Sequence, residues 1–186
     1  MEYDFYKSNN KYFTTMKKTL FYLAALVCCI ATGMAFTSCG DDEPDVTANA
    51  TYSITFGENF FDAVDGVVIY YKDNGKIKFE TVNSGTSWQK SVSGKLPSEF
   101  GFQWNFQAKD AESLTKEVYN LFTTGTIVMS TSNGAGVTQS TPIISNAATK
   151  KSDVVKTIQN ASGKSFGYKV SSRGDATRSD NLDYKL

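Results

Sequence analysis

Cysteine is the residue type with the widest chemistry in this chain of 186 residues, which contains three of them. Cys28 and Cys29 lie inside an apolar run, whereas Cys39 lies after it among small and polar residues. A thiolate is a nucleophile that can take up an acyl or alkyl group. Cys39 is the only site residue that the sequence assigns, and the residues around it decide which of these reactions to expect.

Histidine is absent from the whole sequence. Its absence removes Ser-His-Asp and Cys-His catalysis, histidine-ligated zinc and histidine-ligated haem. An enzyme built from this chain would have to work with carboxylate, Lys, Tyr or Ser groups alone. We therefore expect no enzymatic activity, no cofactor and no metal site.

The elements that would position Cys39 precede it in the sequence. Met16, Lys17 and Lys18 open a short basic stretch, and residues 20–30 form an uninterrupted apolar run of 11 residues. This is the order of a secretory signal peptide. The run is too short for a membrane span, which takes about 20 helical residues. Residues 1–15 fit no part of a signal peptide, and we expect Met16 to be the true start.

The end of this segment, Phe36-Thr37-Ser38-Cys39, resembles the lipobox of bacterial lipoproteins, although Phe36 stands where that family usually has an aliphatic residue. The acidic stretch at residues 40–45 is similar to the tether of Bacteroidota-type surface lipoproteins. The resemblance implies cleavage before Cys39, acylation of its thiol with palmitate-type chains, and an outer-membrane location in the cell envelope. Whether the chain faces the periplasm or the medium stays open.

These observations divide the chain into five parts. They are an upstream extension (1–15), a lipoprotein signal peptide (16–38), a lipidated, flexible acidic tether (39–48), a β-rich globular domain (49–172) and a polar C-terminal tail (173–186). The Pro-containing acidic tether should stay extended and set the domain off the bilayer.

Alternating apolar residues predict most of the strands. Residues 50–57 and 100–108 alternate strictly, the latter burying Phe102, Trp104 and Phe106, and residues 66–82 read as a hairpin around Asn74-Gly75. Further strands are expected in segments rich in β-branched and aromatic residues, namely 87–93, 124–131, 137–144 and 164–172.

Two segments could be helical. We expect a short helix over residues 110–122, with a strand as the alternative, and one or two helical turns over residues 151–159 with Ser152 as the cap. Short strands with polar faces and no long alternating helices predict one mainly β, antiparallel sandwich or barrel-like domain with one or two short helices.

Composition narrows the function. Basic and acidic residues are balanced at 19 each, so nothing suggests a nucleic-acid partner. We expect a membrane-anchored binding or accessory module that captures a glycan or a protein. A structural, fimbrial-type envelope subunit and a carboxylate-based glycan hydrolase remain as alternatives, the latter requiring two convergent acids.

Four smaller features have an ordinary explanation that we prefer. One of Tyr70 and Tyr71 should be exposed as part of a strand, and the tripeptide at residues 173–175 is expected to be a chance match to an integrin-type motif. The acids around residues 58–65 read as solvated loop residues rather than Ca²⁺ ligands. Residues 133–136 read as a hairpin turn rather than a phosphate loop.

Overall fold

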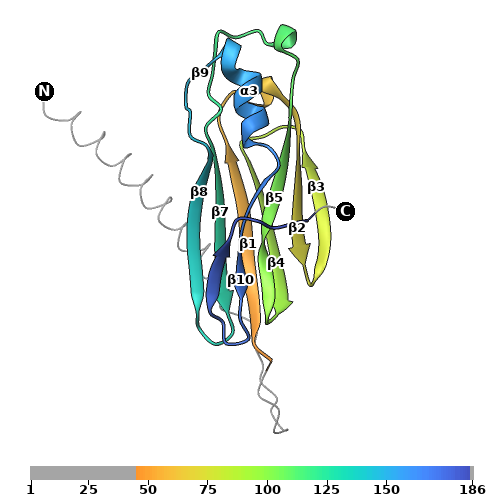
Figure 1. Ribbon diagram of the computed structural model, residues 1–186, viewed down its shortest axis with the longest axis vertical. Coiled ribbons are helices and arrows are strands. Elements are labelled where there is room, and N and C mark those ends of the chain that lie inside the picture. The colour runs from red at the N-terminus through yellow and green to blue at the C-terminus, as the bar shows by residue number, and fades with distance from the viewer. Residues whose placement is uncertain (1–44, 185–186) are drawn as a thin grey trace, which may run out of the picture. The chain divides into compact units, whose positions relative to one another are not determined.

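Two antiparallel sheets face each other across an aromatic core in the part of the chain that the computed structural model describes, residues 45–184 (Figure 1). One sheet has the spatial order β4 (Ser87–Lys95), β1 (Thr47–Phe56), β7 (Thr123–Thr131) and β8 (Gly136–Ile144). The other has the order β11 (Ala176–Ser179), β10 (Lys164–Val170), β5 (Ser98–Ala108), β2 (Val64–Asp73) and β3 (Lys76–Val82). The prediction of a mainly β, antiparallel sandwich is confirmed, and the sheets do not close into a barrel.

Short elements cover one end of the sandwich. They are α2 (Phe60–Ala63), the 3₁₀ turn η1 (Ala111–Ser113), the two-residue strands β6 (Val118–Tyr119) and β9 (Thr149–Lys150), and α3 (Lys151–Ala161). Helix α3 lies over this end, as Figure 1 shows. A hydrogen bond of 2.8 Å, which the Trp104 indole donates to the Ala161 carbonyl, holds the C-terminus of α3 against β5.

The strand predictions are confirmed by the sheet registers. In β1, Tyr52, Ile54 and Phe56 are all buried, as period-two alternation requires. The β2–β3 hairpin turns at Asn74 and Gly75, whose φ angles are 48° and 77°. Positive φ at both positions matches the twist of a tight hairpin. Pro142 lies in β8, which is the edge strand that a proline favours.

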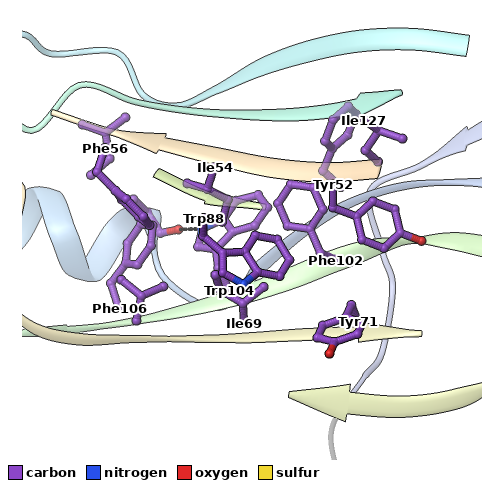
Figure 2. Packing of buried hydrophobic residues seen from close by; sticks show 14 of the residues in the cluster. Tyr52, Ile54, Phe56, Ile69, Tyr71, Trp88, Phe102, Trp104, Phe106 and Ile127 are labelled. Carbon is purple, nitrogen blue, oxygen red and sulfur yellow. Dashed lines mark hydrogen bonds between the residues drawn. The ribbon is translucent and has the colours of Figure 1, made fainter. Parts of the chain in front are cut away.

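The core is built around Phe102 of β5. Its ring lies 5.7 Å from Tyr52, 6.1 Å from Trp88, 5.6 Å from Trp104 and 6.1 Å from Phe166, measured between centroids. Tyr52 and Trp88 come from one sheet and Trp104 and Phe166 from the other, so that Phe102 contacts both sheets. Figure 2 shows Phe102 among Tyr52, Trp88 and Trp104. The predicted burial of the row containing Phe102, Trp104 and Phe106 is confirmed.

The helix expected over residues 110–122 is wrong. Only η1 is helical there, and residues 118–119 form the short strand β6. The apolar residues do not share a helical face, because Leu114, Tyr119 and Leu121 are buried while Val118 and Phe122 are exposed. Helix α3 fulfils the expectation over residues 151–159, but Lys150, not Ser152, is the N-cap residue, and it makes no side-chain capping bond.

The segment set apart by the sequence as a polar tail is part of the domain. Residues 176–179 form β11 beside β10, and Leu182 and Tyr184 are buried. Residues 180–184, here called the C-terminal segment, lie over the outer face of β10 and β5. They are tied there because Ser165 Oγ accepts from the Leu182 amide (2.8 Å) and Gln103 Oε1 accepts from the Tyr184 amide (3.1 Å).

Leu182 needs two glycines beneath it. Gly101 and Gly167 face each other across β5 and β10, and an added Cβ on either would lie 2.3 Å or 2.7 Å from the Leu182 side chain. Both would also approach backbone atoms closer than 3.0 Å. This explains why Gly101 and Gln103 are buried although alternation predicts their face of β5 to be polar and solvated.

Replacement of Phe102 by Ala should lower the free energy of unfolding by about 3–5 kcal/mol, because the cavity lies between both sheets. Phe79→Ala is the matched control, since Phe79 is 55% exposed, and it should cost less than about 1 kcal/mol. Chemical denaturation of both variants measures the difference. Equal losses would contradict a core centred on Phe102.

Replacement of Gly167 by Ala should cost about 1–3 kcal/mol by overpacking, because the backbone carbonyl of Phe100 would lie 2.5 Å from the new Cβ. Gly94→Ala is the control, as its nearest neighbour would lie at 3.4 Å. The denaturation midpoints of the two variants measure the difference in stability. A neutral Gly167→Ala would show that the C-terminal segment does not require this close approach.

Candidate functional site

The sandwich has two long edges, and the contacts between the two sheets differ at these edges. At the first edge, β3 faces β4, and a carboxylate bridges them. At the second edge, β8 faces β10 and β11, and a groove lies between them. A binding site in a sandwich needs a place where the polar side chains are not already hydrogen-bonded to one another.

Glu80 closes the first edge. Its carboxylate accepts hydrogen bonds from the Tyr71 hydroxyl (2.9 Å), the Trp88 indole (2.8 Å) and the Lys90 ammonium (2.5 Å). Tyr71 lies on β2, whereas Trp88 and Lys90 lie on β4, so these bonds connect the two sheets. We call these four residues the Glu80 cluster.

The charged groups of the Glu80 cluster stabilise one another. Burial by itself raises the pKa of the Glu80 carboxyl, but the hydrogen bonds from Lys90, Trp88 and Tyr71 outweigh it, and the pKa lies below its ordinary value. The hydrogen bond to Glu80 raises the pKa of Lys90 in turn. Each polar group has a partner, so the cluster acts as a structural clasp and leaves little for a ligand to bind.

The second edge holds a groove of about 630 Å³, a volume typical of small-molecule sites. We call it the edge groove. Its walls come from β8, from the start of β10, and from the end of β11 with the C-terminal segment. Its lining residues are Gln103, Trp104, Thr141, Pro142, Ile143, Gly163, Lys164, Ser165, Phe166, Arg178, Asp180, Asn181, Leu182 and Asp183.

Arg178 is held at the edge groove by two contacts. Its guanidinium carbon lies 5.1 Å from the centre of the Phe166 ring, and its Nε donates to both carboxylate oxygens of Asp180 at 2.9 and 3.0 Å. Within residues 45–184 its two terminal nitrogens donate no hydrogen bond. Arg178 and Asp180 are about half exposed, at 46% and 53% of their side-chain surface, so both remain accessible.

The floor of the edge groove is closely packed. Phe166 and Trp104 are 1% and 3% exposed and belong to the core. Ser165 fixes the wall above them, because its hydroxyl donates to the Asp180 carbonyl and accepts from the Leu182 amide, both at 2.8 Å. The chain around Asp180 and Asn181 is thereby held against β10.

A second hollow of about 650 Å³ lies beside α3 at the covered end of the sandwich. Val118, which is 51% exposed, and Val155 line it, with Glu117, Lys150 and Lys151 among the other lining residues. It is open and mostly aliphatic near Val118. Compared with the edge groove, it offers fewer fixed hydrogen-bonding groups.

Cys39 lies outside the described residues, and its modification stays a prediction. Tyr71 is buried and Tyr70 half-buried beside the exposed Phe79, at 6.0 Å between ring centroids. Residues 173–175 lie in the turn between β10 and β11, where Arg173 and Asp175 are exposed and Gly174 is buried. The Arg173 carbonyl accepts a hydrogen bond from the Asn133 side chain (2.7 Å).

The acids around residues 58–65 do not form a loop cluster. Asp62 lies in α2 and pairs with Lys116 at 2.5 Å, and Asp65 lies in β2. Within the described part of the chain, no group of three or more acidic or cysteine side chains is placed to hold a metal ion. In that part there is also no helix with the length and hydropathy to cross a membrane.

The edge groove was missed by the sequence analysis because Arg178, Asp180 and Asn181 fall in the segment taken for a tail. A signal was present in Leu182 and Tyr184, which alternate with polar neighbours as a strand lying on a surface does. Nothing in the sequence indicated that Thr141 of the β7–β8 hairpin would lie opposite Lys164 and Arg178 of the β10–β11 hairpin.

Comparisons of this chain with protein-family models, with curated proteins and with solved structures found no match.

Replacement of Glu80 by Gln should lower the free energy of unfolding at pH 7 by about 1–2 kcal/mol, because Lys90 loses its charged partner. Since the folded-state pKa of Glu80 is depressed, its contribution is complete above the ordinary value of 4.5 and is lost as the pH falls through the folded-state pKa. The gap between wild type and variant should therefore close at acidic pH. Denaturation at several pH values, with the exposed Glu112→Gln as control, measures it; a constant gap would contradict the clasp.

Proposed function

We propose that this chain is a lipid-anchored lipoprotein of the bacterial cell envelope, and that its β-sandwich is a non-catalytic binding module. In this proposal the anchor is a diacylglyceryl group on Cys39, and the ligand, a glycan or a protein, is held in the edge groove. The edge groove is the observation that supports the binding function, and the sequence of residues 16–45 is what supports the lipid anchor.

The anchor is supported by chemistry and by spacing. A single acyl chain binds a bilayer only marginally, so a modified Cys39 with several chains is what stable attachment requires. Strand β1 begins at Thr47, eight residues after Cys39. That stretch can span at most about 28 Å when fully extended. The end of the sandwich where β1 begins would therefore lie nearest the membrane.

The position of the edge groove suits such an anchor. Thr141 and Pro142 pair with residues 124 and 125 of β7, which in turn pair with residues 54 and 55 near the end of β1. With a rise of about 3.4 Å per residue, this part of β1 lies roughly 25 Å from its start. A ligand in the edge groove would thus be held away from the bilayer surface.

The binding role is supported by the contrast between the two edges. At the first edge the Glu80 cluster satisfies its polar groups internally. At the second edge, the Lys164 ammonium and the terminal nitrogens of Arg178 make no hydrogen bond to another of the described residues. Rigid strands hold these groups, which is what a preformed binding site needs. A carboxylate-based hydrolase would need two convergent acids with free oxygens in a cleft, and of the two acids that line the edge groove, Asp180 is already engaged by Arg178.

Replacement of Cys39 by Ala should release the protein from the membrane fraction of its native host, because no other acyl acceptor is expected. Cys28→Ala is the matched control and should leave attachment unchanged, since Cys28 lies within the signal peptide. Intact mass and detergent partitioning measure both variants. A wild-type protein without acyl mass, or with a different first residue, would overturn the proposed anchor.

A further inference from the structure

We infer that the ligand of the edge groove is an uncharged glycan, and that Arg178 and Asp180 together bind two neighbouring sugar hydroxyls. This inference rests on the binding function proposed above and names the ligand class of the same site. It follows from the charge balance of the groove, from the order of its charged pair and from the kind of surface that lines it.

The charges of the edge groove cancel. Among its described lining residues, Lys164 and Arg178 are basic and Asp180 and Asp183 are acidic. A ligand with a net charge would gain attraction from one pair of these charges and repulsion from the other. A charge complement of this kind favours a neutral ligand that interacts through hydrogen bonds.

The donors and acceptors lie side by side. Arg178 offers two terminal nitrogens as donors, and the Asp180 carboxylate next to it has lone pairs left after receiving Nε. A sugar hydroxyl both donates and accepts, so one hydroxyl can give its proton to Asp180 while its neighbour accepts from Arg178. Thr141 and Asn181 add further uncharged polar groups to the walls.

Arg178 is ordered before a ligand arrives. Packing over Phe166 and two bonds to Asp180 restrict its rotamers. An arginine held in this way loses less conformational entropy on binding than a free surface arginine. This order distinguishes Arg178 from Arg173, which lies exposed on the turn before β11.

A protein ligand fits the groove less well. Protein interfaces are organised around aromatic or aliphatic anchors in desolvated pockets. Three large apolar residues of the groove, Trp104, Phe166 and Leu182, are at most 6% exposed and form its floor. The half-buried Ile143 and the exposed Pro142 leave apolar surface on the β8 wall, but they do not form a desolvated pocket of that kind. Strand addition to β8 is hindered by Pro142, which has no amide proton to donate.

The test measures binding of six-unit oligosaccharides to the full chain in detergent by titration calorimetry. Neutral hexamers of glucose, mannose, galactose and xylose are compared with an anionic hexagalacturonate and a cationic chitosan hexamer. The variants are Arg178→Lys, Asp180→Asn and the matched control Arg173→Lys, each checked for an unchanged melting temperature. At least one neutral hexamer should bind. Arg178→Lys and Asp180→Asn should weaken that binding about tenfold or more, and Arg173→Lys less than twofold.

Three results would overturn the inference. Tighter binding of a charged hexamer than of every neutral one would make the groove an ion-selective site while leaving the binding module intact. Equal effects of Arg178→Lys and Arg173→Lys would place the sugar elsewhere. If no hexamer binds, a photo-crosslinker placed at Thr141 in living cells tests whether the edge groove binds a protein instead. A crosslinked protein would show that the ligand is a protein and not a glycan. The absence of any crosslink would contradict the proposed binding function as well.

Discussion

The ring of Phe102 is the contact on which the arrangement of both sheets depends. Sheets in a sandwich pack about 10 Å apart, and large aromatic side chains fill that distance better than aliphatic ones. Because Phe102 contacts Tyr52 and Trp88 of the facing sheet, the strands β1 and β4 must lie at fixed positions over β5. The hydroxyl of Tyr52 adds direction, since it accepts a hydrogen bond of 3.0 Å from the Gly101 amide of the opposite sheet.

The aromatic core also explains why the two edges differ. Trp88 brings an indole N–H to the first edge, and a buried indole needs an acceptor. Glu80 supplies it, and the same carboxylate then holds Tyr71 and Lys90, so that this edge is closed by polar bonds. At the second edge the core ends in Phe166, which has no polar atom to satisfy. Arg178 packs on that ring instead, and the sheets remain apart with a groove between them.

Local patterns were sufficient to predict the strands but not the elements that depend on distant contacts. Alternation in residues 50–57 and 100–108 and the Asn74-Gly75 turn each contain their own physical cause, and the structure confirms them. Residues 110–122 have apolar side chains at nearly helical spacing, yet burial of Leu114, Tyr119 and Leu121 against separate neighbours stabilises an irregular chain instead. The polar residues 176–179 become a strand only because β10 offers them a free edge. The edge groove could not be predicted for the same reason, since its walls meet only in the folded chain.

The edge groove and the stability of the domain share residues. Two glycines in neighbouring strands are unfavourable, because each loses more backbone entropy than another residue would. Here Gly101 and Gly167 make room for Leu182, whose burial offsets part of that cost. The same contact, together with the two hydrogen bonds of Ser165, holds Asp180 and Asn181 at the groove wall. A change that loosens the C-terminal segment would therefore act on stability and on the proposed ligand contacts at once, whereas a change confined to the terminal nitrogens of Arg178 would act on the ligand contacts alone.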